Sequence, residues 1–468
     1  MDAKSVVERV ARVWDNDVLP TITDYIRIPN RSPAFDPQWA EHGHMANAVE
    51  LISSWMKGRP IAGLQVSVAQ LEGRTPVILA EVPGTAAGTV VLYGHLDKQP
   101  EMSGWREGLG PWEPVLEGDR LYGRGAGDDG YAAFAALTAI EAVQASGGAH
   151  ARLVVIIEAS EESGSPDLPA YMDELADRIG EPDLVVCLDS GCPTWDRLWL
   201  TTSLRGLIAL TLTVRMLEEG VHSGAAGGVV PSTFRIMREL LSRVEDETTG
   251  EILLRELHVE MPVDREKELA ATAGELGSDI SERFPFVDGA RATAEDPIAQ
   301  LVAKTWHPTM ELIGIDGVPS VADGGNVLRP FTTAQLSFRL PPTCDSVAAS
   351  EALVAALTAE PPYGASVEAL ARELADGWNA PPTAPWLASA IDEASLAGFG
   401  ESARTTGEGG TIPFMAMLGQ RFPDAQFVIT GVLGPETNAH GPNEFLHLPT
   451  AQHVTVAVAH VLDAHARR

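Results

Sequence analysis

Five short clusters of acidic residues and histidines lie far apart along this 468-residue chain, each at the end of a strand-like run. The clusters are Gly94-His95-Leu96-Asp97, Gly127-Asp128-Asp129-Gly130, Glu161-Glu162-Ser163-Gly164, Asp189 after residues 184–188, and Asn438-Ala439-His440-Gly441. Two imidazoles and several carboxylates suit a pair of divalent cations that share one bridging carboxylate. The hypothesis depends on all five clusters together, because each cluster alone has an ordinary structural explanation.

Two of the clusters show how such a site could be built. His95 and Asp97 are two residues apart, so on an extended segment their side chains project to one face. Asp97 can then accept a hydrogen bond from the imidazole nitrogen that His95 does not use on a metal. Glu161 and Glu162 follow a buried strand, where carboxylates are costly unless a cation meets them. One glutamate can bind a cation while the other stays free as a general acid or base.

The paired aspartates allow a rival interpretation. Asp128 could give one oxygen to each cation, but Gly125-x-Gly127-x-x-Gly130 also matches the dinucleotide fingerprint in form. That motif presents bare backbone amides to a pyrophosphate, which two carboxylates would repel, and no convincing ribose-binding acid follows about 20 residues on. HExxH and GxSxG are both absent, which argues against a single-zinc helix motif and a serine-hydrolase elbow.

A sheet whose strands end at one edge would bring these side chains together. Strand-like segments at 77–82, 89–93, 153–157 and 184–188 alternate with helix-like segments at 131–145 and 168–179. This rhythm predicts an α/β domain with a mostly parallel sheet covered by helices. Ligands gather beyond the carboxyl ends of such strands, where His95, Glu161, Glu162 and Asp189 fall.

From residue 205 onward the pattern becomes that of an α+β domain. Strand-like segments at 207–214 and 336–340 accompany helix-like segments at 231–245 and 346–358, and a proline-rich stretch follows near residue 380. A helix at 386–397, a strand at 426–432 and a helix at 451–464 would complete the first domain. We therefore expect a catalytic domain made of residues 1–204 and 380–468, with a lid or dimerisation domain inserted at 205–379.

Composition limits the partners and the location. The formal net charge is −32, from 65 acidic against 33 basic residues, which disfavours nucleic acid and anionic membrane surfaces. No apolar run approaches the roughly 18 to 20 residues that a membrane span needs. The 3 cysteines form no CxxC pair, and the start of the chain carries charges where a signal peptide is apolar. We expect no nucleic-acid or membrane partner and a cytoplasmic location.

The order of the clusters along the chain and their local sequences resemble those of a family of dinuclear-zinc peptidases and amidohydrolases. It includes cytosolic dipeptidase, carnosinase, succinyl-diaminopimelate desuccinylase and aminoacylase. The matching motifs are Gly94-His95-Leu96-Asp97 with Gln99-Pro100, Gly123-Arg124-Gly125 with Asp128-Asp129, Glu161-Glu162-Ser163-Gly164-Ser165, His222-Ser223-Gly224, Gly409-Gly410-Thr411-Ile412-Pro413, and Asn438-Ala439-His440. Chain length and the large inserted domain look more like the dipeptidase branch than like the shorter desuccinylases.

The resemblance implies two divalent metal ions per chain, with zinc as the expected metal and manganese or cobalt as alternatives. The implied ligands are His95 and Asp189 for one ion, Glu162 and His440 for the other, and Asp128 as the bridge. Glu161 would be the general base, and Asp97 would assist catalysis by orienting His95. Family members hold the peptide bond between the paired aspartates in the cis form.

The inserted domain would supply His222, Asn326 and Arg339 to the substrate, and the second catalytic segment would supply residues 409–411. His222 would stabilise the oxyanion, a role that the other subunit of a homodimer often fills in this family. Arg339 would clamp the substrate's free carboxylate, a task that suits a guanidinium fork. The other implied substrate-binding residues are Asn326, Gly409, Gly410 and Thr411. The resemblance thus implies a homodimer formed through the inserted domain, and closure of the two domains during catalysis.

The predicted function is hydrolysis of the amide bond of dipeptides or short peptides with a free C-terminal carboxylate. Glu161 would take the proton of a water that bridges the two metal ions. An N-acyl amino-acid amidohydrolase of the deacylase or desuccinylase type would use the same site. A non-catalytic relative that only binds or dimerises is a third possibility, opposed by the complete set of ligands.

Two positions depart from the dipeptidase-like pattern. Gly130 stands where such members usually carry lysine, and Lys98 stands where they tend to have an aliphatic residue. Neither position is a metal ligand. Both are close enough to the ligands to leave the substrate preference open.

Overall fold

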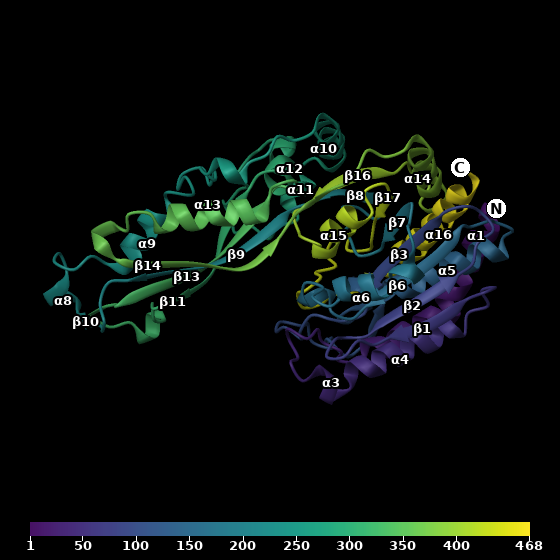
Figure 1. Ribbon diagram of the computed structural model, residues 1–468, viewed down its shortest axis with the longest axis horizontal. Coiled ribbons are helices and arrows are strands. Elements are labelled where there is room, and N and C mark those ends of the chain that lie inside the picture. Colours follow the sequence, from purple (N-terminus) through teal and green to yellow (C-terminus); the bar gives the residue numbers. More distant parts are fainter. The chain divides into compact units, whose positions relative to one another are not determined.

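The chain forms two compact units, and the structure, a computed structural model, describes residues 1–468 apart from the side chain of Pro413 (Figure 1). Unit 1 contains Met1–Thr202, Ala380–Thr406 and Met417–Arg468, and unit 2 contains Ser203–Asn379 and Gly407–Ala416. Residues 407–416, which we expected within the second catalytic segment, thus group with unit 2. Hydrogen bonding explains this, because the Arg205 amide donates to the Gly410 carbonyl over 3.1 Å.

Unit 1 is built on a six-stranded sheet in the order β1-β2-β6-β3-β7-β17. Its strands are β1 (Gln65–Ala69), β2 (Val77–Val82), β3 (Thr89–His95), β6 (Arg152–Glu158), β7 (Leu184–Cys187) and β17 (Gln426–Ile429). β3 pairs in parallel with β6 and β7, and β7 with β17, whereas β1 and β2 run antiparallel at one edge. A second sheet contains β4 (Val115–Glu117), β5 (Arg120–Tyr122) and β18 (Phe445–His447). The predicted α/β class is confirmed.

Helices cover the six-stranded sheet and bury apolar side chains against it. The helices of unit 1 are α1 (Ala3–Val13), α2 (Leu19–Ile26), α3 (Trp39–His42), α4 (His44–Lys57), α5 (Tyr131–Ala145), α6 (Leu168–Glu174), α7 (Ala176–Ile179), α14 (Pro385–Gly398) and α16 (Leu448–Arg467). α5 packs between strands β3 and β6 on one side and helices α1 and α16 on the other, so it is buried almost throughout. The segment 168–179, predicted as one helix, is interrupted at Leu175 and forms α6 and α7.

Unit 2 is built on a four-stranded antiparallel sheet in the order β11-β13-β9-β14 (Figure 1). Its strands are β9 (Gly206–Arg215), β11 (Thr309–Asp316), β13 (Phe331–Leu340) and β14 (Ser366–Ala375). Alternate residues of β9 are buried, including Ile208 and Leu210, under helices α9 (Thr233–Leu241) and α13 (Ser346–Thr358). Further elements are β10 (Val221–His222), α8 (Ser223–Ala226), α10 (Val263–Leu276), α11 (Asp279–Glu282), α12 (Pro297–Thr305), β12 (Val327–Leu328) and β15 (Trp378–Asn379).

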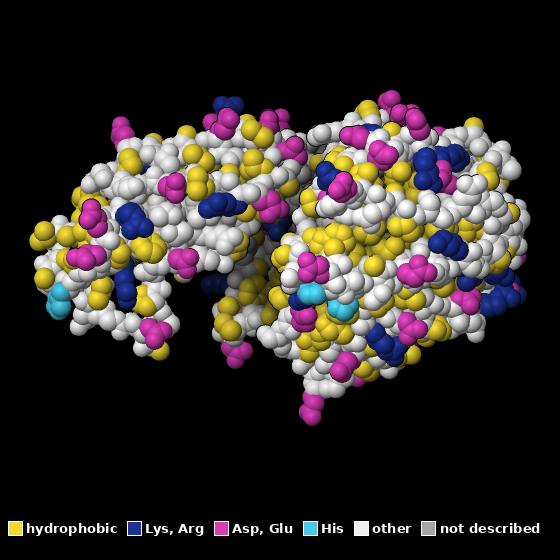
Figure 2. Space-filling view, turned by 60° about the horizontal axis from the view of Figure 1, so that its bottom comes forward, with side chains coloured by type: hydrophobic (Ala, Val, Ile, Leu, Met, Phe, Trp, Pro, Cys, Tyr) yellow, Lys and Arg dark blue, Asp and Glu magenta, His cyan; other side chains and the backbone are white. Residues whose placement is uncertain are grey.

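The chain passes between the units within β8 (Trp199–Leu204), β16 (Arg404–Glu408) and α15 (Pro413–Arg421). Acidic side chains are scattered over the face drawn in Figure 2 and do not gather in one patch there. Among the described residues, the structure contains no helix of the length and apolarity that crossing a membrane requires.

Candidate active site

Three parallel strands of unit 1 deliver acidic and imidazole side chains to one edge of the sheet. His95 is the last residue of β3, and Asp189 lies two residues beyond the end of β7. Glu161 and Glu162 begin a single turn, Glu161–Ser163, three residues beyond the end of β6. Because β3 pairs in parallel with both β6 and β7, these strand ends meet at the same edge.

Asp128 lies at the centre of this group. Its Oδ1 is 3.3 Å from His95 Nε2, and its Oδ2 is 3.0 Å from His440 Nε2. His95 Nε2 is also 3.7 Å from Asp189 Oδ2, and His440 Nε2 is 3.2 Å from Glu162 Oε2. One carboxylate therefore faces two imidazole–carboxylate pairs, one with each oxygen. This is the arrangement that a ligand bridging two cations needs.

The residues around the paired aspartates hold the backbone of the site. The Asp128–Asp129 peptide bond is cis, as the resemblance implies. Asp129 is buried, and its Oδ2 accepts a hydrogen bond of 3.2 Å from the His95 amide. Gly94 permits this contact, because a Cβ atom there would come within 2.4 Å of Ala132 and 2.7 Å of Asp129 Oδ2.

Asp97 has a wider role than the one expected for it. His95 Nδ1 is 3.2 Å from the Asp97 backbone carbonyl and 3.5 Å from the carboxylate oxygen Oδ1. The carboxylate itself accepts hydrogen bonds from the backbone amides of Glu161 at 3.1 Å and Glu162 at 3.0 Å. Asp97 thus holds the turn that carries both glutamates, in addition to orienting His95.

Burial and crowding shift the acid–base behaviour of this group. Burial, with Asp189 as the largest charged contributor, raises the pKa of Glu161 well above its usual range. Burial also raises the pKa of Asp189 to about 7, against the opposing effect of His95. Burial raises the pKa of Asp128 as well, but hydrogen bonds from His440 and His95 outweigh it and bring that pKa well below its usual range. The carboxylates repel one another and hold protons that a cation would replace.

The histidines show the complementary effect. Burial lowers the pKa of His440, but hydrogen bonds to Asp128 and Glu162 outweigh it and raise the pKa to about 11. Burial also lowers the pKa of His95, but the neighbouring carboxylates outweigh burial and raise this pKa well above its usual range. Positive charge is therefore favoured at the two points where the imidazoles meet the carboxylates.

The donor set fits a pair of divalent cations. Glu162 Oε1 is buried without a hydrogen-bond partner among the described residues, and buried His95 Nε2 faces carboxylate oxygens of Asp128, Asp189 and Glu161 at 3.3 to 3.8 Å. Nitrogen and carboxylate donors of this kind suit zinc, and manganese or cobalt can also use them. Ligand atoms of His95, Glu161 and Asp189 lie within 4.8 Å of one another, as do those of His95, Asp128 and Glu162.

The two adjacent glutamates differ in their surroundings. The Glu162 side chain is 3% exposed, and its Oε2 accepts a hydrogen bond of 2.6 Å from Gln99 Nε2. The Glu161 side chain is 12% exposed, and its Oε2 lies 3.8 Å from His95 Nε2. Glu161 is therefore within reach of a cation bound at His95. Its distance from His95 is compatible both with a metal ligand and with a general base.

In unit 2, His222 and Asn326 come together at one end of the sheet. β10 pairs with β12, which opposes His222 to Val327, and the Asn326 carbonyl accepts a hydrogen bond of 2.9 Å from the Ser223 amide. His222 Nδ1 accepts a hydrogen bond of 3.1 Å from the Gly224 amide, and the ring is exposed. An imidazole that accepts at Nδ1 carries its proton on Nε2, where it can donate to a substrate oxygen.

A second group in unit 2 gathers around Arg339. Its guanidinium donates to the Thr411 hydroxyl at 3.0 Å, and that hydroxyl donates to the Arg205 carbonyl at 2.6 Å. Arg205 is buried, and its guanidinium donates to the Gly409 carbonyl at 3.0 Å and to Thr309 Oγ1 at 3.2 Å. Neither arginine has a carboxylate within ion-pair distance among the described residues.

Sequence reasoning missed Arg205. Burial and the charge of Arg339 lower its pKa to about 10, which still leaves it charged at neutral pH. The only signal in the sequence was an arginine between two strand-like runs that otherwise contain no charge. That signal is weak, because a single arginine between strands is common on protein surfaces.

The structure gives the two departures from the family pattern a structural explanation. Lys98 is fully buried, and its Nζ donates to the carbonyls of Tyr25 and Ile28, each at 2.8 Å, at the end of α2. A Cβ atom on Gly130 would come within 2.3 Å of the Tyr25 ring and 2.5 Å of the Gly125 carbonyl. Both positions therefore face the interior around Tyr25.

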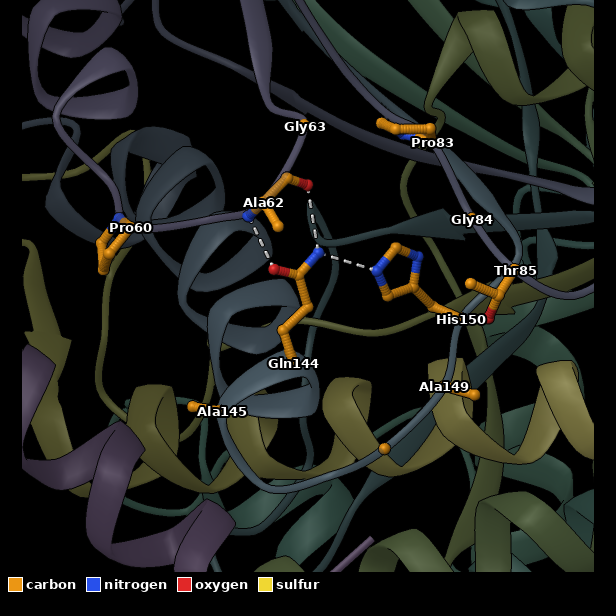
Figure 3. A pocket seen from close by; sticks show the side chains of 11 residues that line it. Pro60, Ala62, Gly63, Pro83, Gly84, Thr85, Gln144, Ala145, Ala149 and His150 are labelled. Atoms are coloured by element: carbon orange, nitrogen blue, oxygen red, sulfur yellow. Dashed lines mark hydrogen bonds between the residues drawn. The ribbon is translucent and has the colours of Figure 1, made fainter.

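A pocket of about 690 Å³ elsewhere in unit 1 has no comparable chemistry (Figure 3). It lies at the start of β6, the opposite end of that strand from Glu161. Gln144 accepts a hydrogen bond of 2.8 Å from the Ala62 amide and donates to His150 Nε2 at 3.0 Å, while His150 Nδ1 donates to the Ala151 carbonyl at 2.8 Å. These polar groups form hydrogen bonds with one another and with the backbone, and they join residue 62 to residues 144 and 150.

Comparisons with known proteins extend over both units. A family model described as Peptidase family M20/M25/M40 matches residues 91–464. The cysteinylglycine-S-conjugate dipeptidase of Corynebacterium striatum is 27% identical over 470 residues, which cover 96% of this chain and 98% of that protein. The solved structure of human carnosine dipeptidase 1 has a TM-score of 0.79 at 21% identity, covering 100% of this chain and 99% of that one. An M20 family metallo-carboxypeptidase from Sulfolobus solfataricus has a TM-score of 0.78 at 19% identity, covering 97% and 100%.

Proposed function

Because the chain belongs to peptidase family M20/M25/M40 and is a metallopeptidase, we propose that it cleaves dipeptides or short peptides that end in a free carboxylate. The observation that carries the proposal is the position of Asp128, with one carboxylate oxygen toward His95 and the other toward His440. Two dipeptidases are among the relatives, and the match covers 98% and 89% of their lengths.

The proposed ligand sets follow the two imidazole–carboxylate pairs. His95 and Asp189 would hold one divalent cation, Glu162 and His440 would hold the other, and Asp128 would contact both. When bound, zinc or a similar cation supplies Lewis-acid activation of the attacking water and of the scissile carbonyl. Asp97 would keep His95 and the glutamate turn in place through the hydrogen bonds described above.

Glu161 is the proposed general base. It is the more exposed of the two adjacent glutamates and is held by its backbone amide to Asp97. Burial and Asp189 raise its pKa, which brings the carboxyl toward the range in which it can both accept and return a proton. Glu161 would take a proton from the attacking water and deliver it to the leaving amine.

The free carboxylate of the substrate would bind at Arg339. The guanidiniums of Arg205 and Arg339 lie around the Thr411 hydroxyl with no carboxylate within ion-pair distance among the described residues, and an anion would offset their mutual repulsion. Gly409, Gly410 and Thr411 would shape this subsite, because Gly409 and Gly410 accept hydrogen bonds from Arg205. This feature favours substrates with a C-terminal carboxylate.

A homodimer formed through unit 2 is part of the proposal. His222 and Asn326 are joined to the start of β13, whereas Arg339 is near its end. A strand of that length spans on the order of 30 Å, far more than a dipeptide. His222 and Arg339 of one chain are thus too far apart to contact one small substrate. We infer that His222 acts on a substrate bound by the partner subunit.

A substrate panel tests the proposal. Enzyme loaded with zinc, manganese or cobalt would be given a dipeptide, the same dipeptide with an amidated C-terminus, and its N-acetyl or N-succinyl counterpart. We expect the free dipeptide to be cleaved fastest. Preferential cleavage of the N-acyl compounds would replace this function with that of an amidohydrolase.

We also propose that the protein works in a reducing compartment such as the cytoplasm. Cys187, Cys192 and Cys344 are all buried and free. Expression of a tagged chain followed by cell fractionation would test this location.

A further inference from the structure

The loop that carries His440 has an unusual backbone. Four non-glycine residues between 436 and 443 have positive φ angles: Glu436 at 64°, Asn438 at 52°, His440 at 65° and Asn443 at 63°. Left-handed conformations are unfavourable for residues with a Cβ atom and persist only where the surroundings hold them. His440 itself is 57% exposed, so packing of its own ring does not fix it. Something else must hold this loop.

Arg124 makes the contacts that can do so. Its NH2 group donates to the carbonyl of Gly441 at 2.7 Å and to the carbonyl of His440 at 3.3 Å. Arg124 therefore binds the backbone of His440, the proposed metal ligand. Its NH1 group pairs with Glu444 at 2.5 Å, and its Nε donates to the Pro100 carbonyl at 3.1 Å. A planar guanidinium can serve all these acceptors at once, whereas a lysine ammonium cannot.

Glu444 completes the connection from the other side. Its second oxygen accepts a hydrogen bond of 2.9 Å from the Gly125 amide, and its backbone carbonyl accepts one of 3.0 Å from the Gly123 amide. Arg124 is 1% exposed and Glu444 is fully buried. A buried, fully hydrogen-bonded pair of this kind fixes geometry, and removing one partner leaves the other charge without compensation.

The same arginine also reaches the other ligand of this cation. Pro100, whose carbonyl Arg124 holds, directly follows Gln99, and Gln99 Nε2 donates to Glu162 Oε2 at 2.6 Å. The Arg124 guanidinium therefore contacts the backbone of His440 directly and is connected to Glu162 through Pro100 and Gln99. No comparable contact runs from Arg124 to His95 or Asp189 among the described residues.

We propose that Arg124 and Glu444 are positioning residues for one cation only, the one held by Glu162 and His440. The inference rests on the proposed function, because it assumes that these two residues are ligands. The pair holds the His440 loop in its left-handed conformation before a cation arrives. Outer-shell partners of metal ligands typically change metal affinity by about 10- to 100-fold when they are replaced.

The chain offers a matched control in the same loop. Arg120 pairs with Glu436 at 2.9 Å, but these side chains are 38% and 70% exposed. An exposed pair of this kind contributes little to the geometry of its neighbours. Arg120→Gln therefore removes an exposed ion pair and a cation–π contact of 4.5 Å with the Phe445 ring, but none of the hydrogen bonds of the Arg124–Glu444 pair.

Cobalt titration of the full-length protein tests the proposal. Metal-free wild type, Arg124→Lys, Glu444→Gln and Arg120→Gln would be titrated with Co²⁺ and followed by visible absorbance and calorimetry. We expect two Co²⁺ ions in wild type and in Arg120→Gln. Arg124→Lys and Glu444→Gln should lose about tenfold or more in affinity at one site, with the other site within about twofold of wild type.

A double variant identifies the affected site. His440→Ala should weaken the same Co²⁺ site, and adding Arg124→Lys to it should cause a smaller loss than Arg124→Lys causes alone, because only the connection through Gln99 to Glu162 is then left to be broken. Unchanged affinities in Arg124→Lys and Glu444→Gln would overturn the inference and leave the proposed function intact. An equal loss at both sites, or a loss of the circular dichroism of the metal-free fold, would also overturn it. Fewer than two Co²⁺ ions in wild type would overturn the proposed function and the inference with it.

Discussion

The sheet edge of unit 1 and the Arg339 group of unit 2 carry opposite kinds of unbalanced charge. In unit 1, buried carboxylates crowd together until the pKa of Asp189 rises to about 7. In unit 2, neither Arg205 nor Arg339 has a carboxylate within ion-pair distance among the described residues, and burial together with Arg339 lowers the pKa of Arg205 to about 10 against the weaker opposing effect of Glu311. The first region therefore favours the binding of cations, and the second favours the binding of an anion.

This difference suggests a division of labour. A group that collects cations can activate water and a carbonyl, whereas a group that collects an anion can only select and orient a substrate. Substitutions in unit 1 should therefore act mainly on kcat, and those around Arg339 mainly on KM. His222 breaks the simple division, because it lies in unit 2 but is proposed to act on the reacting carbonyl.

The largest expected effect is that of Glu161→Gln. Turnover should fall by about 10³-fold or more, because the proposed base can no longer accept a proton, while the amide side chain preserves the shape of the site. Cation content measured by atomic spectroscopy should stay at the wild-type value. Loss of one cation together with activity would instead make Glu161 a ligand, which its distance from His95 also permits.

His222→Ala should lower kcat by about 10²- to 10³-fold through loss of one oxyanion donor, with unchanged cation content. Mixing this variant with Glu161→Gln and allowing subunits to exchange tests whether His222 acts across a dimer. Recovery of activity in the mixture is expected, because hybrid dimers contain one site with both residues intact. No recovery, despite exchange of subunits, would place His222 and Glu161 in the same chain's site.

Arg339→Ala should raise KM about 10- to 100-fold for a free dipeptide, the loss expected for a charge-assisted contact. The amidated dipeptide provides the control, since it offers no carboxylate to bind. Arg205→Met should also raise KM for the free dipeptide, but by less than Arg339→Ala. The Arg205 guanidinium already donates to the Gly409 carbonyl, so it has fewer donors left for a substrate carboxylate. Equal effects of Arg339→Ala on both substrates would show that the arginine is structural.

The smallest expected effect is a dependence of cation affinity on pH. Asp189, with its pKa raised to about 7, and the two imidazoles hold protons that a cation must displace. Apparent affinity should therefore rise as the pH increases from about 6 to 8, with release of protons on binding. Calorimetry in buffers of different ionisation enthalpy measures that release. Affinity that does not change with pH would show that the carboxylates are already ionised and free of protons.

The meeting of acidic and imidazole side chains at one end of the strands was predictable, because parallel strands end at one edge of the sheet. β3 ends at His95, whereas Asp189 and Glu161 lie two and three residues beyond the ends of β7 and β6, and the parallel pairing of these strands leaves few other arrangements. Chain order and local motifs, through the family resemblance, assigned the remaining roles. The roles of individual residues stay predictions until the variants above are measured.

Other features depend on contacts between distant residues and could not be predicted. Residues 407–416 carry a motif of the family resemblance, but nothing in the sequence indicates to which unit they belong, and their hydrogen bonds with Arg205 place them in unit 2. Lys98 suggested an effect on substrate preference, but its ammonium is buried against the carbonyls at the end of α2. The link from Arg124 to the His440 loop joins residues more than 300 positions apart.

The most direct test of the central claim is the number of cations per chain in wild type and in Asp128→Asn. If Asp128 bridges two cations, wild type should hold two per chain, and Asp128→Asn should weaken both, because an amide offers only one good donor oxygen. The metal-free variant should retain the wild-type circular dichroism. One cation per chain in wild type, or a variant that keeps full affinity for both, would contradict the account.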